Sequence, residues 1–380
     1  VNTNIGHQHP RVVNAIQAQA GSLCTIAPAH ANLARGEAAK RIIAKAPDGF
    51  SKVFFTNAGA DANENAIRMA RLYTGRTKIL SAYRSYHGNT GSAIAATGDW
   101  RRVPNEYASG HVHFFNPYLY RNEFWARDEN EECERALTHL RRVIECEGAN
   151  AVAAILLETI PGTAGVLLPP QAYLQGVRKL ADEFGIVLIL DEVMAGFGRT
   201  GRWFAFEHYD MAPDLIVFAK GVNSGYVPAG GVIISAPISD YFDDHFFVGG
   251  LTYSGHPLAM AAIVATLDAM EEEGIVENAD SVGNGPLAEG LQRLAERHAL
   301  IGDWRGVGVF HALELVSDPV RKTPLPGSEV LKLKQRLMEH GLLVFTVENR
   351  IHVVPPCTVT AAEVEEGLAI LERVFAEYAA

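Results

Sequence analysis

The chain has 380 residues, of which 48% are hydrophobic and 20% are charged, and its formal net charge is -11. This length exceeds one ordinary hydrophobic core, so we expect about two domains in a soluble globular protein. The negative charge, together with the lack of any Lys or Arg run longer than two, argues against nucleic acid as the main partner. No apolar run approaches the ~18 residues of a membrane span, so we expect no membrane partner.

The cysteines are scattered through the chain without C-x-x-C spacing, at Cys24, Cys133, Cys146 and Cys357. This pattern fits reduced thiols in a cytoplasmic protein better than a disulfide framework or a metal site. The chain opens at Val1 with the turn-rich stretch "VNTNIGHQHP". We therefore expect upstream residues, including any targeting segment, to be missing from this numbering.

Short apolar runs alternate with amphipathic helical patterns through the first three quarters of the chain. The runs predict strands at 52–56, 78–82, 152–157, 186–190, 215–218 and 230–235, and the patterns predict helices at 61–73, 131–147 and 171–184. Such alternation indicates an α/β fold with a mostly parallel sheet and helices on both faces. Sheets of this kind bind their ligands at the carboxyl ends of the strands.

The pattern changes near residue 285. The sequence then predicts a helix at 287–298, a strand at 309–316, a helix at 328–340, a hairpin within 342–356 and a closing helix at 361–377. We interpret residues 26–285 as a large domain. Residues 1–25 and 286–380 form a smaller α+β domain in this interpretation, with its N-terminal part incomplete.

Two predicted strands end in charged residues. The run "IVLIL" leads directly into Asp191 and Glu192, and "LIVFA" leads into Lys220. A lysine beside an apolar wall is costly unless it is paired or its pKa falls, and a neutral amine is what a Schiff-base lysine needs. Pyridoxal phosphate requires such a lysine together with a carboxylate that keeps its ring nitrogen protonated. The alternative is a lysine that caps a strand and reaches solvent.

Other segments offer candidate contacts for the same cofactor. Gly59 and Ala60 precede an amphipathic helix whose N-terminal N–H groups suit a phosphate, although an ordinary N-capped helix explains them equally well. Tyr86 and His87 follow a strand, where an aromatic ring can stack on a flat cofactor or simply pack against the protein. Glu158 also ends a buried strand, where it either serves the site or reaches solvent.

The stretch "GFGRTG" matches G-x-G-x-x-G at Gly196, Gly198 and Gly201. Five residues separate the strand from the first glycine, and the residues that follow show no clean helical stripe. The strand–turn–helix context of a dinucleotide site is therefore missing, and we disfavour a nicotinamide cofactor.

The chain resembles the class III (ω-type) aminotransferases of fold type I, from "GHQHP" at 6–10 to "VVPPC" at 353–357. The most specific motifs are "LILDEVMAGFGRTG", "FAKGVNSGYVPAGGV" and "GLTYSGHPLAMAA". The resemblance implies a pyridoxal 5'-phosphate (PLP) enzyme, closest in kind to taurine and ω-amino acid–pyruvate aminotransferases. It also implies the fold of that type, a large domain with a mostly parallel sheet flanked by helices plus a smaller α+β domain.

The same resemblance assigns roles to individual residues. Lys220 looks like the cofactor-bound lysine and proton shuttle, Asp191 like the partner of the ring nitrogen, and Val193 and Tyr86 like the residues on the two ring faces. It implies cofactor binding, with no metal, by a larger set: Gly59, Ala60, Tyr86, His87, Glu158, Asp191, Val193, Lys220 and Thr252. Many relatives carry a hydroxyl residue in place of Ala60, so one phosphate hydrogen bond is in doubt.

Two further implications concern the partner chain and the substrate. Thr252 matches a threonine that binds the phosphate of the neighbouring subunit's cofactor, so a homodimer or dimer of dimers with shared active sites is expected. Many relatives carry a carboxylate-binding arginine where this chain has Phe345. The nearest substitute is Arg350, which serves the substrate or is a hairpin residue that faces water.

These observations predict a PLP-dependent aminotransferase that works by a ping-pong mechanism. We expect it to move an amino group from a primary amine, ω-amino acid or aminosulfonate to a small keto acid, with pyruvate as the expected acceptor. An aminomutase or decarboxylase of the same family, or a catalytically silent protein on this fold, is the alternative.

Overall fold

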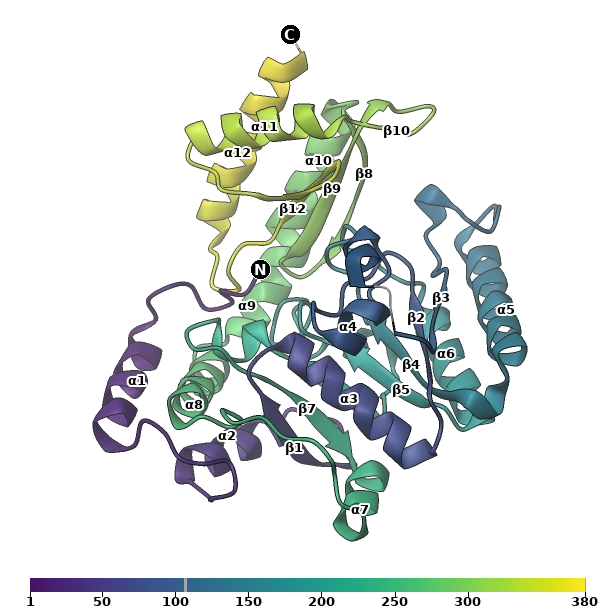
Figure 1. Ribbon diagram of the computed structural model, residues 1–380. Coiled ribbons are helices and arrows are strands. Elements are labelled where there is room, and N and C mark those ends of the chain that lie inside the picture. The colour runs from purple at the N-terminus through teal and green to yellow at the C-terminus, as the bar shows by residue number, and fades with distance from the viewer. Residues whose placement is uncertain (106–107, 380) are drawn as a thin grey trace.

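The computed structural model describes residues 1–105 and 108–379. Within these residues, the larger of two sheets has seven strands in the order β1-β7-β6-β5-β4-β2-β3 (Figure 1). The strands are β1 (Phe50–Thr56), β2 (Lys78–Ala82), β3 (His111–Phe114), β4 (Val152–Glu158), β5 (Val187–Asp191), β6 (Leu215–Phe218) and β7 (Gly230–Ser235). Among them, β7 alone runs opposite to the other six strands. The predicted mostly parallel sheet is confirmed.

The central strands are buried on both faces, which explains their continuous apolar sequences. Alternate residues such as Leu156 and Ile189 pack with helix α3 (Gly59–Thr74), which crosses one face of the sheet (Figure 1). Their neighbours Ile155 and Leu188 belong to the core on the opposite face, which includes helix α6 (Gln171–Phe184). Helices thus cover both faces, as the alternating pattern predicts.

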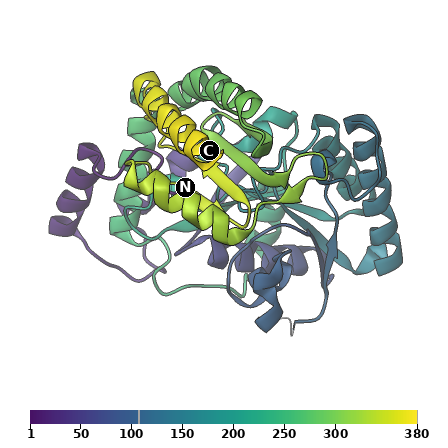
Figure 2. The same cartoon turned by 90° about the horizontal axis from the view of Figure 1, so that it is seen from above.

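The second sheet is antiparallel and contains five of the described strands. These are β8 (Ile301–Val307), β9 (Phe310–Asp318), β10 (Thr323–Pro324), β11 (Phe345–Val347) and β12 (Arg350–Val353). Helices α10 (Ala288–Arg297), α11 (Gly327–Glu339) and α12 (Ala361–Ala379) accompany it. Seen from above, this part lies over the middle of the molecule, between α1 (Pro10–Ser22) on one side and α5 (Glu129–Glu147) on the other (Figure 2).

Several elements have no counterpart among the predicted segments. They are α1, α2 (Leu33–Ile43), α4 (Gly91–Ala96), α7 (Ala236–Asp244), α8 (Pro257–Glu272), α9 (Ile275–Val282), β3, β8 and β10. Helix α8 is buried on most sides because α1, α2 and the turn after Lys220 all pack against it. Its sequence consequently lacks the single apolar stripe that marks an amphipathic helix.

The N-terminal segment contacts both parts of the molecule. The Asn4 carbonyl accepts from Cys357 N, and the Asn4 side chain donates to Phe197 O at 2.7 Å. Helix α1 packs on α8, beside the larger sheet (Figure 1). The domain limits 26–285 and 1–25 with 286–380 stay a prediction.

Candidate active site

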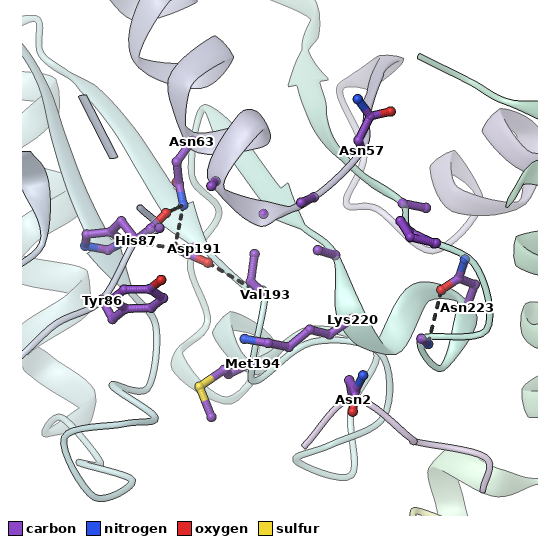
Figure 3. A pocket seen from close by; sticks show the side chains of 18 of the residues that line it. Asn2, Asn57, Asn63, Tyr86, His87, Asp191, Val193, Met194, Lys220 and Asn223 are labelled. Atoms are coloured by element: carbon purple, nitrogen blue, oxygen red, sulfur yellow. Dashed lines mark hydrogen bonds and ion pairs between the residues drawn. The ribbon is translucent and has the colours of Figure 1, made fainter. Parts of the chain in front are cut away.

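A cavity of about 410 Å³ opens at the carboxyl ends of β4, β5 and β6. It is lined by the start of α3, residues 86–88, the ends of β4 and β5, residues 219–229 and Asn2 from the N-terminal segment (Figure 3). Most of the predicted cofactor residues line it: Gly59, Ala60, Tyr86, His87, Glu158, Asp191, Val193 and Lys220. Parallel strands bring their carboxyl ends to one edge of a sheet, so residues that follow different strands meet here.

Asp191 is buried at the end of β5 and receives hydrogen bonds from three directions. His87 Nδ1 and Asn63 Nδ2 each lie 2.8 Å from Asp191 Oδ2, and Val193 N donates to Oδ1 at 3.0 Å (Figure 3). A carboxylate held by several N–H donors in a buried site has a fixed orientation and a partly balanced charge.

Lys220 follows β6 at the start of a 3-10 turn, and its side chain extends into the cavity (Figure 3). Burial lowers the pKa of Lys220, the nearby carboxylates of Asp191 and Glu158 oppose that shift, and the charge of Arg101 adds to it. The Lys220 backbone has a φ of +42°, in the left-handed region that favours glycine. Such strain is common at functional sites, where the surrounding structure fixes the residue.

Glu158 faces the inside of the protein rather than solvent. It pairs in register with Asp191 on the adjacent strand, and burial raises its pKa. Its two oxygens accept from Tyr86 N at 2.9 Å and Gly162 N at 2.8 Å. The Gly162 carbonyl in turn lies 2.9 Å from Nε2 of His352, on β12 of the second sheet. Glu158 therefore fixes the backbone that carries Tyr86.

The N-terminus of α3 opens onto the same cavity. Helix α3 begins at Gly59, and no described side chain caps it at Ala58, so its first N–H groups are available to a ligand. A Cβ at Gly59 would lie 2.9 Å from a methyl group of Val193, so glycine allows this close approach. Free N–H groups at the start of a 16-residue helix suit a phosphate.

These features fit PLP in one cavity. Lys220 would supply an amine for the aldehyde, Asp191 a carboxylate for the ring nitrogen, and the start of α3 a site for the phosphate. Tyr86 and Val193 both line the space between them (Figure 3). Lys220 and the carboxylates of Asp191 and Glu158 therefore do not simply cap strands and reach solvent, because each lines this cavity.

The glycines of "GFGRTG" have a different role from that in a dinucleotide site. Residues 193–200 form consecutive turns, and Gly198 and Gly201 have φ values of +86° and +79°. A Cβ at Gly201 would lie 2.7 Å from the Asp280 backbone. These glycines make a tight turn and a close contact with α9.

Three predicted site residues lie outside the cavity as the described residues define it. Thr252 is exposed on the loop before α8. The Phe345 ring packs on His352. Arg350 pairs with Glu348, and its stem lies over the backbone of residue 165. The roles proposed for Thr252, Phe345 and Arg350 stay predictions.

The structure adds two residues that sequence reasoning missed. Asn63 lies one turn into α3, where its spacing from Gly59 was a usable signal that it faces the cavity. Arg101 lies in a 3-10 turn, with its guanidinium carbon 3.9 Å from the centroid of the Tyr86 ring. Nothing in "DWRRVPN" distinguishes Arg101 from a basic loop residue.

The chain matches the family model of class III aminotransferases over residues 1–375. It is 30% identical to a taurine–pyruvate aminotransferase of Bilophila wadsworthia, over 98% of this chain and 85% of that protein. It is 35% identical to a leucine/methionine racemase of Thermococcus litoralis, over 98% of this chain and 84% of that one.

Among solved structures, a taurine:2-oxoglutarate aminotransferase of Bifidobacterium kashiwanohense, in complex with PLP and glutamate, superposes with a TM-score of 0.96. It is 44% identical, and the match covers 99% of this chain and 86% of that one. The family match spans nearly the whole chain and includes both sheets. The protein belongs to the class III aminotransferases and is a PLP-dependent enzyme of that family.

Proposed function

We propose that the enzyme transfers the amino group of an acid-bearing amine, an ω-amino acid or aminosulfonate, to a small keto acid by a ping-pong mechanism. Pyruvate is the expected acceptor. This narrows the donor class expected from the sequence, which also includes primary amines without an acid group. The observation that supports the narrowing is the position of Arg101 beside the cavity.

Arg101 places a guanidinium next to the cofactor site. It stacks on Tyr86 at 3.9 Å, and its charge lowers the pKa of Lys220. Asp99 binds it with its carboxylate, and Thr163 Oγ1 accepts from Nη2 at 3.2 Å, while about a third of the side chain stays exposed. A guanidinium held in this way retains N–H groups for a carboxylate or sulfonate.

The residues around the cavity have complementary roles in this reaction. When bound, PLP supplies an electron sink for the deprotonated substrate carbon. Lys220, with its lowered pKa, is able to accept and return that proton as a neutral amine. With the cofactor bound, Asp191 would offer its carboxylate to the ring nitrogen, and Tyr86 and Val193, which line the same cavity, would restrict the ring.

Arg350 with Phe345 is the competing proposal for the acid group. It requires Arg350 to leave Glu348 and move past residue 165 toward the cavity. The test compares Arg101→Met with Arg350→Met, using taurine, β-alanine, 4-aminobutyrate and 1-phenylethylamine, which has no acid group, each with pyruvate and then 2-oxoglutarate.

We expect Arg101→Met to raise KM for the acid-bearing donors by at least about tenfold, with little change for 1-phenylethylamine. Arg350→Met is expected to leave the donor KM values nearly unchanged. The reverse pattern supports Arg350 and contradicts the role of Arg101. Turnover without any keto acid would instead favour a racemase, aminomutase or decarboxylase.

We also propose that two copies of the chain form the working unit. Thr252 lies on a segment that exposes large apolar side chains, including Phe246 at 88% and Tyr253 at 65%. Exposed apolar surface of this kind is typical of an interface. A second copy would cover it and would receive Thr252 at its cofactor phosphate.

Mixed dimers test this arrangement. Lys220→Ala homodimers are expected to be inactive, and Thr252→Ala homodimers to retain PLP poorly. A heterodimer of the two combines an intact Lys220 with the partner's intact Thr252 at one site, so mixing is expected to restore activity and cofactor retention. No gain on mixing would contradict the shared site.

The cytoplasmic location stays a prediction. Among the described residues, no helix has the length and apolar character of a membrane span.

A further inference from the structure

The segment 159–166, which follows β4, is bound to the second sheet at two carbonyl groups. The Gly162 carbonyl lies 2.9 Å from His352 Nε2, and the Gly165 carbonyl accepts from Arg305 Nε at 2.7 Å. His352 belongs to β12 and Arg305 to β8. Two strands of the second sheet therefore hold a segment that starts at the cavity.

The backbone of this segment has little freedom to move. Gly165 N and Val166 N both donate to the Gly162 carbonyl, at 2.9 and 3.1 Å, and close a turn over residues 162–166, the Thr163 turn. Val166 is fully buried and has a φ of +53°, in the left-handed region that β-branched residues rarely adopt. Such a conformation persists only where the surrounding structure fixes it. Gly162 also packs against Met194, which lines the cavity.

The Thr163 turn holds Arg101 through one hydroxyl group. Thr163 Oγ1 accepts from Arg101 Nη2 at 3.2 Å. The pair with Asp99 has a different effect, because Asp99 is only two residues from Arg101 and moves with it. Trp100 between them is 72% exposed, so packing restrains this stretch weakly. Together with the stacking on Tyr86, Thr163 therefore ties the guanidinium to a fixed part of the protein.

We propose that Thr163 is a positioning residue that sets the preference for acid-bearing donors by fixing the Arg101 guanidinium, and that the second sheet contributes to this preference by holding the Thr163 turn. The proposal rests on the proposed function, in which Arg101 binds the acid group. A guanidinium that is already ordered loses less conformational entropy when it binds a carboxylate or sulfonate. Within the described residues, neither Thr163 nor His352 lines the cavity, so donor preference depends on contacts outside it.

The first test removes the hydroxyl and keeps the shape of the side chain. We expect Thr163→Val to raise KM for taurine and β-alanine by about three- to fivefold, while KM for 1-phenylethylamine and kcat with every donor change by less than about twofold. Thr163→Ser keeps the acceptor and should retain the wild-type ratio of KM values. Equal KM changes for donors with and without an acid group, or an equal effect of Thr163→Ser, would overturn the proposal.

Thr159→Val is the matched control. Thr159 lies in the same segment, but its hydroxyl donates to Glu192 Oε1 at 2.6 Å instead of binding Arg101. The control should leave the ratio of KM values unchanged even if it lowers the melting temperature. An equal shift of the ratio in Thr159→Val would assign the effect to a general disturbance of the segment and overturn the proposal.

A double variant separates this proposal from the proposed function. If Thr163 acts through Arg101, adding Thr163→Val to Arg101→Met should not raise the acid-donor KM further, because effects that run through one residue do not add. An unchanged acid-donor KM in Arg101→Met would contradict the proposed function itself. A raised KM in Arg101→Met with none in Thr163→Val would overturn only the role of Thr163.

The contribution of the second sheet is tested at His352. His352→Phe keeps a ring at this buried position and removes the donor to Gly162, whereas His352→Gln keeps an N–H group near the position of Nε2. We expect His352→Phe to raise the acid-donor KM about two- to threefold, with no further rise when Thr163→Val is present, and His352→Gln to restore it. An unchanged ratio of KM values in folded His352→Phe would overturn this contribution. If His352→Phe folds poorly, the Thr163 variants decide the proposal.

Discussion

The carboxyl edge of the larger sheet and the hairpin of the second sheet are built on different principles. At the edge, Glu158, Asp191 and Lys220 follow three neighbouring strands and meet at one buried cavity. In the hairpin, Phe345 is 39% exposed and Arg350 pairs with a glutamate of the turn. The placement of the charged residues at the edge therefore depends on strand register, whereas the direction of the Arg350 side chain depends on its contacts with the turn.

The largest effect is expected at the edge, from Lys220→Ala. This variant should lose transamination entirely while still binding PLP, because the contacts at Asp191 and at the start of α3 remain. Activity assays and the absorption spectrum of the reconstituted variant measure the two properties. Borohydride reduction of the wild type should attach the cofactor to the peptide that contains Lys220, and label on another lysine would refute the assignment.

Asp191→Asn is expected to lower kcat by about 10²-fold or more, because the amide keeps the shape of the side chain but removes its charge. The melting temperature should fall modestly, since the single amide oxygen can accept either from Val193 N or from the donors at Oδ2, but not from both. Steady-state kinetics and thermal unfolding provide the comparison. A rate near that of the wild type would make the Asp191 carboxylate structural.

The hairpin should respond differently. If the competing proposal for Arg350 is correct, Arg350→Ala raises the keto-acid KM by at least about tenfold, a loss of roughly 1.4 kcal/mol of binding. Its pairing with Glu348 outside the cavity leads us to expect a smaller change than that. Measuring the keto-acid KM at saturating donor distinguishes a tenfold rise from a smaller change. A tenfold rise would show that Arg350 of the hairpin binds the keto acid.

Glu192 sharpens the comparison because it neighbours Asp191 but supports the fold. It is fully buried and accepts from Thr159 Oγ1, Ala205 N and Phe206 N, and burial raises its pKa from 4.5 to about 7. Between pH 4.5 and about pH 7, the unfolded chain binds fewer protons at this carboxyl group than the native chain does. Wild-type stability should therefore fall as pH rises through this window, by roughly 3 kcal/mol, and then level off.

Glu192→Gln cannot ionise, so its stability should lack this part of the pH dependence. Denaturant unfolding of both proteins between about pH 4.5 and pH 8 measures the difference in slope. The kcat of the variant should stay close to that of the wild type. Parallel slopes for the two proteins would show that Glu192 does not titrate in this window.

Much of this edge could be predicted from the sequence because buried strands leave a clear signal. The runs before Glu158, Asp191 and Lys220 are apolar on both faces, so a charge at their ends is conspicuous. The alternation of side chains along a strand also separates Asp191 from Glu192. Arg101 left no comparable signal and Asn63 left only its helical spacing from Gly59, because their roles depend on contacts with residues distant in the sequence.

The hairpin limits what sequence reasoning can reach. The segment 342–356 correctly predicted two strands, which fix Phe345 opposite His352 in register. The direction of the Arg350 side chain depends instead on the loop near residue 165 and on Glu348. Cross-strand spacing alone could not reveal that these neighbours hold it away from the cavity.

Gly162 has a consequence for which mutations of the hairpin the active site can tolerate. Its N–H binds Glu158 and its carbonyl meets His352, while a Cβ there would lie 2.5 Å from Met194 Sδ. Mutations at the base of the hairpin would therefore disturb Glu158 and, through it, the backbone of Tyr86. Mutations at the hairpin tip meet no such constraint. We expect natural or laboratory evolution to tolerate substitutions at the tip more readily than at the base, where they would reach Glu158.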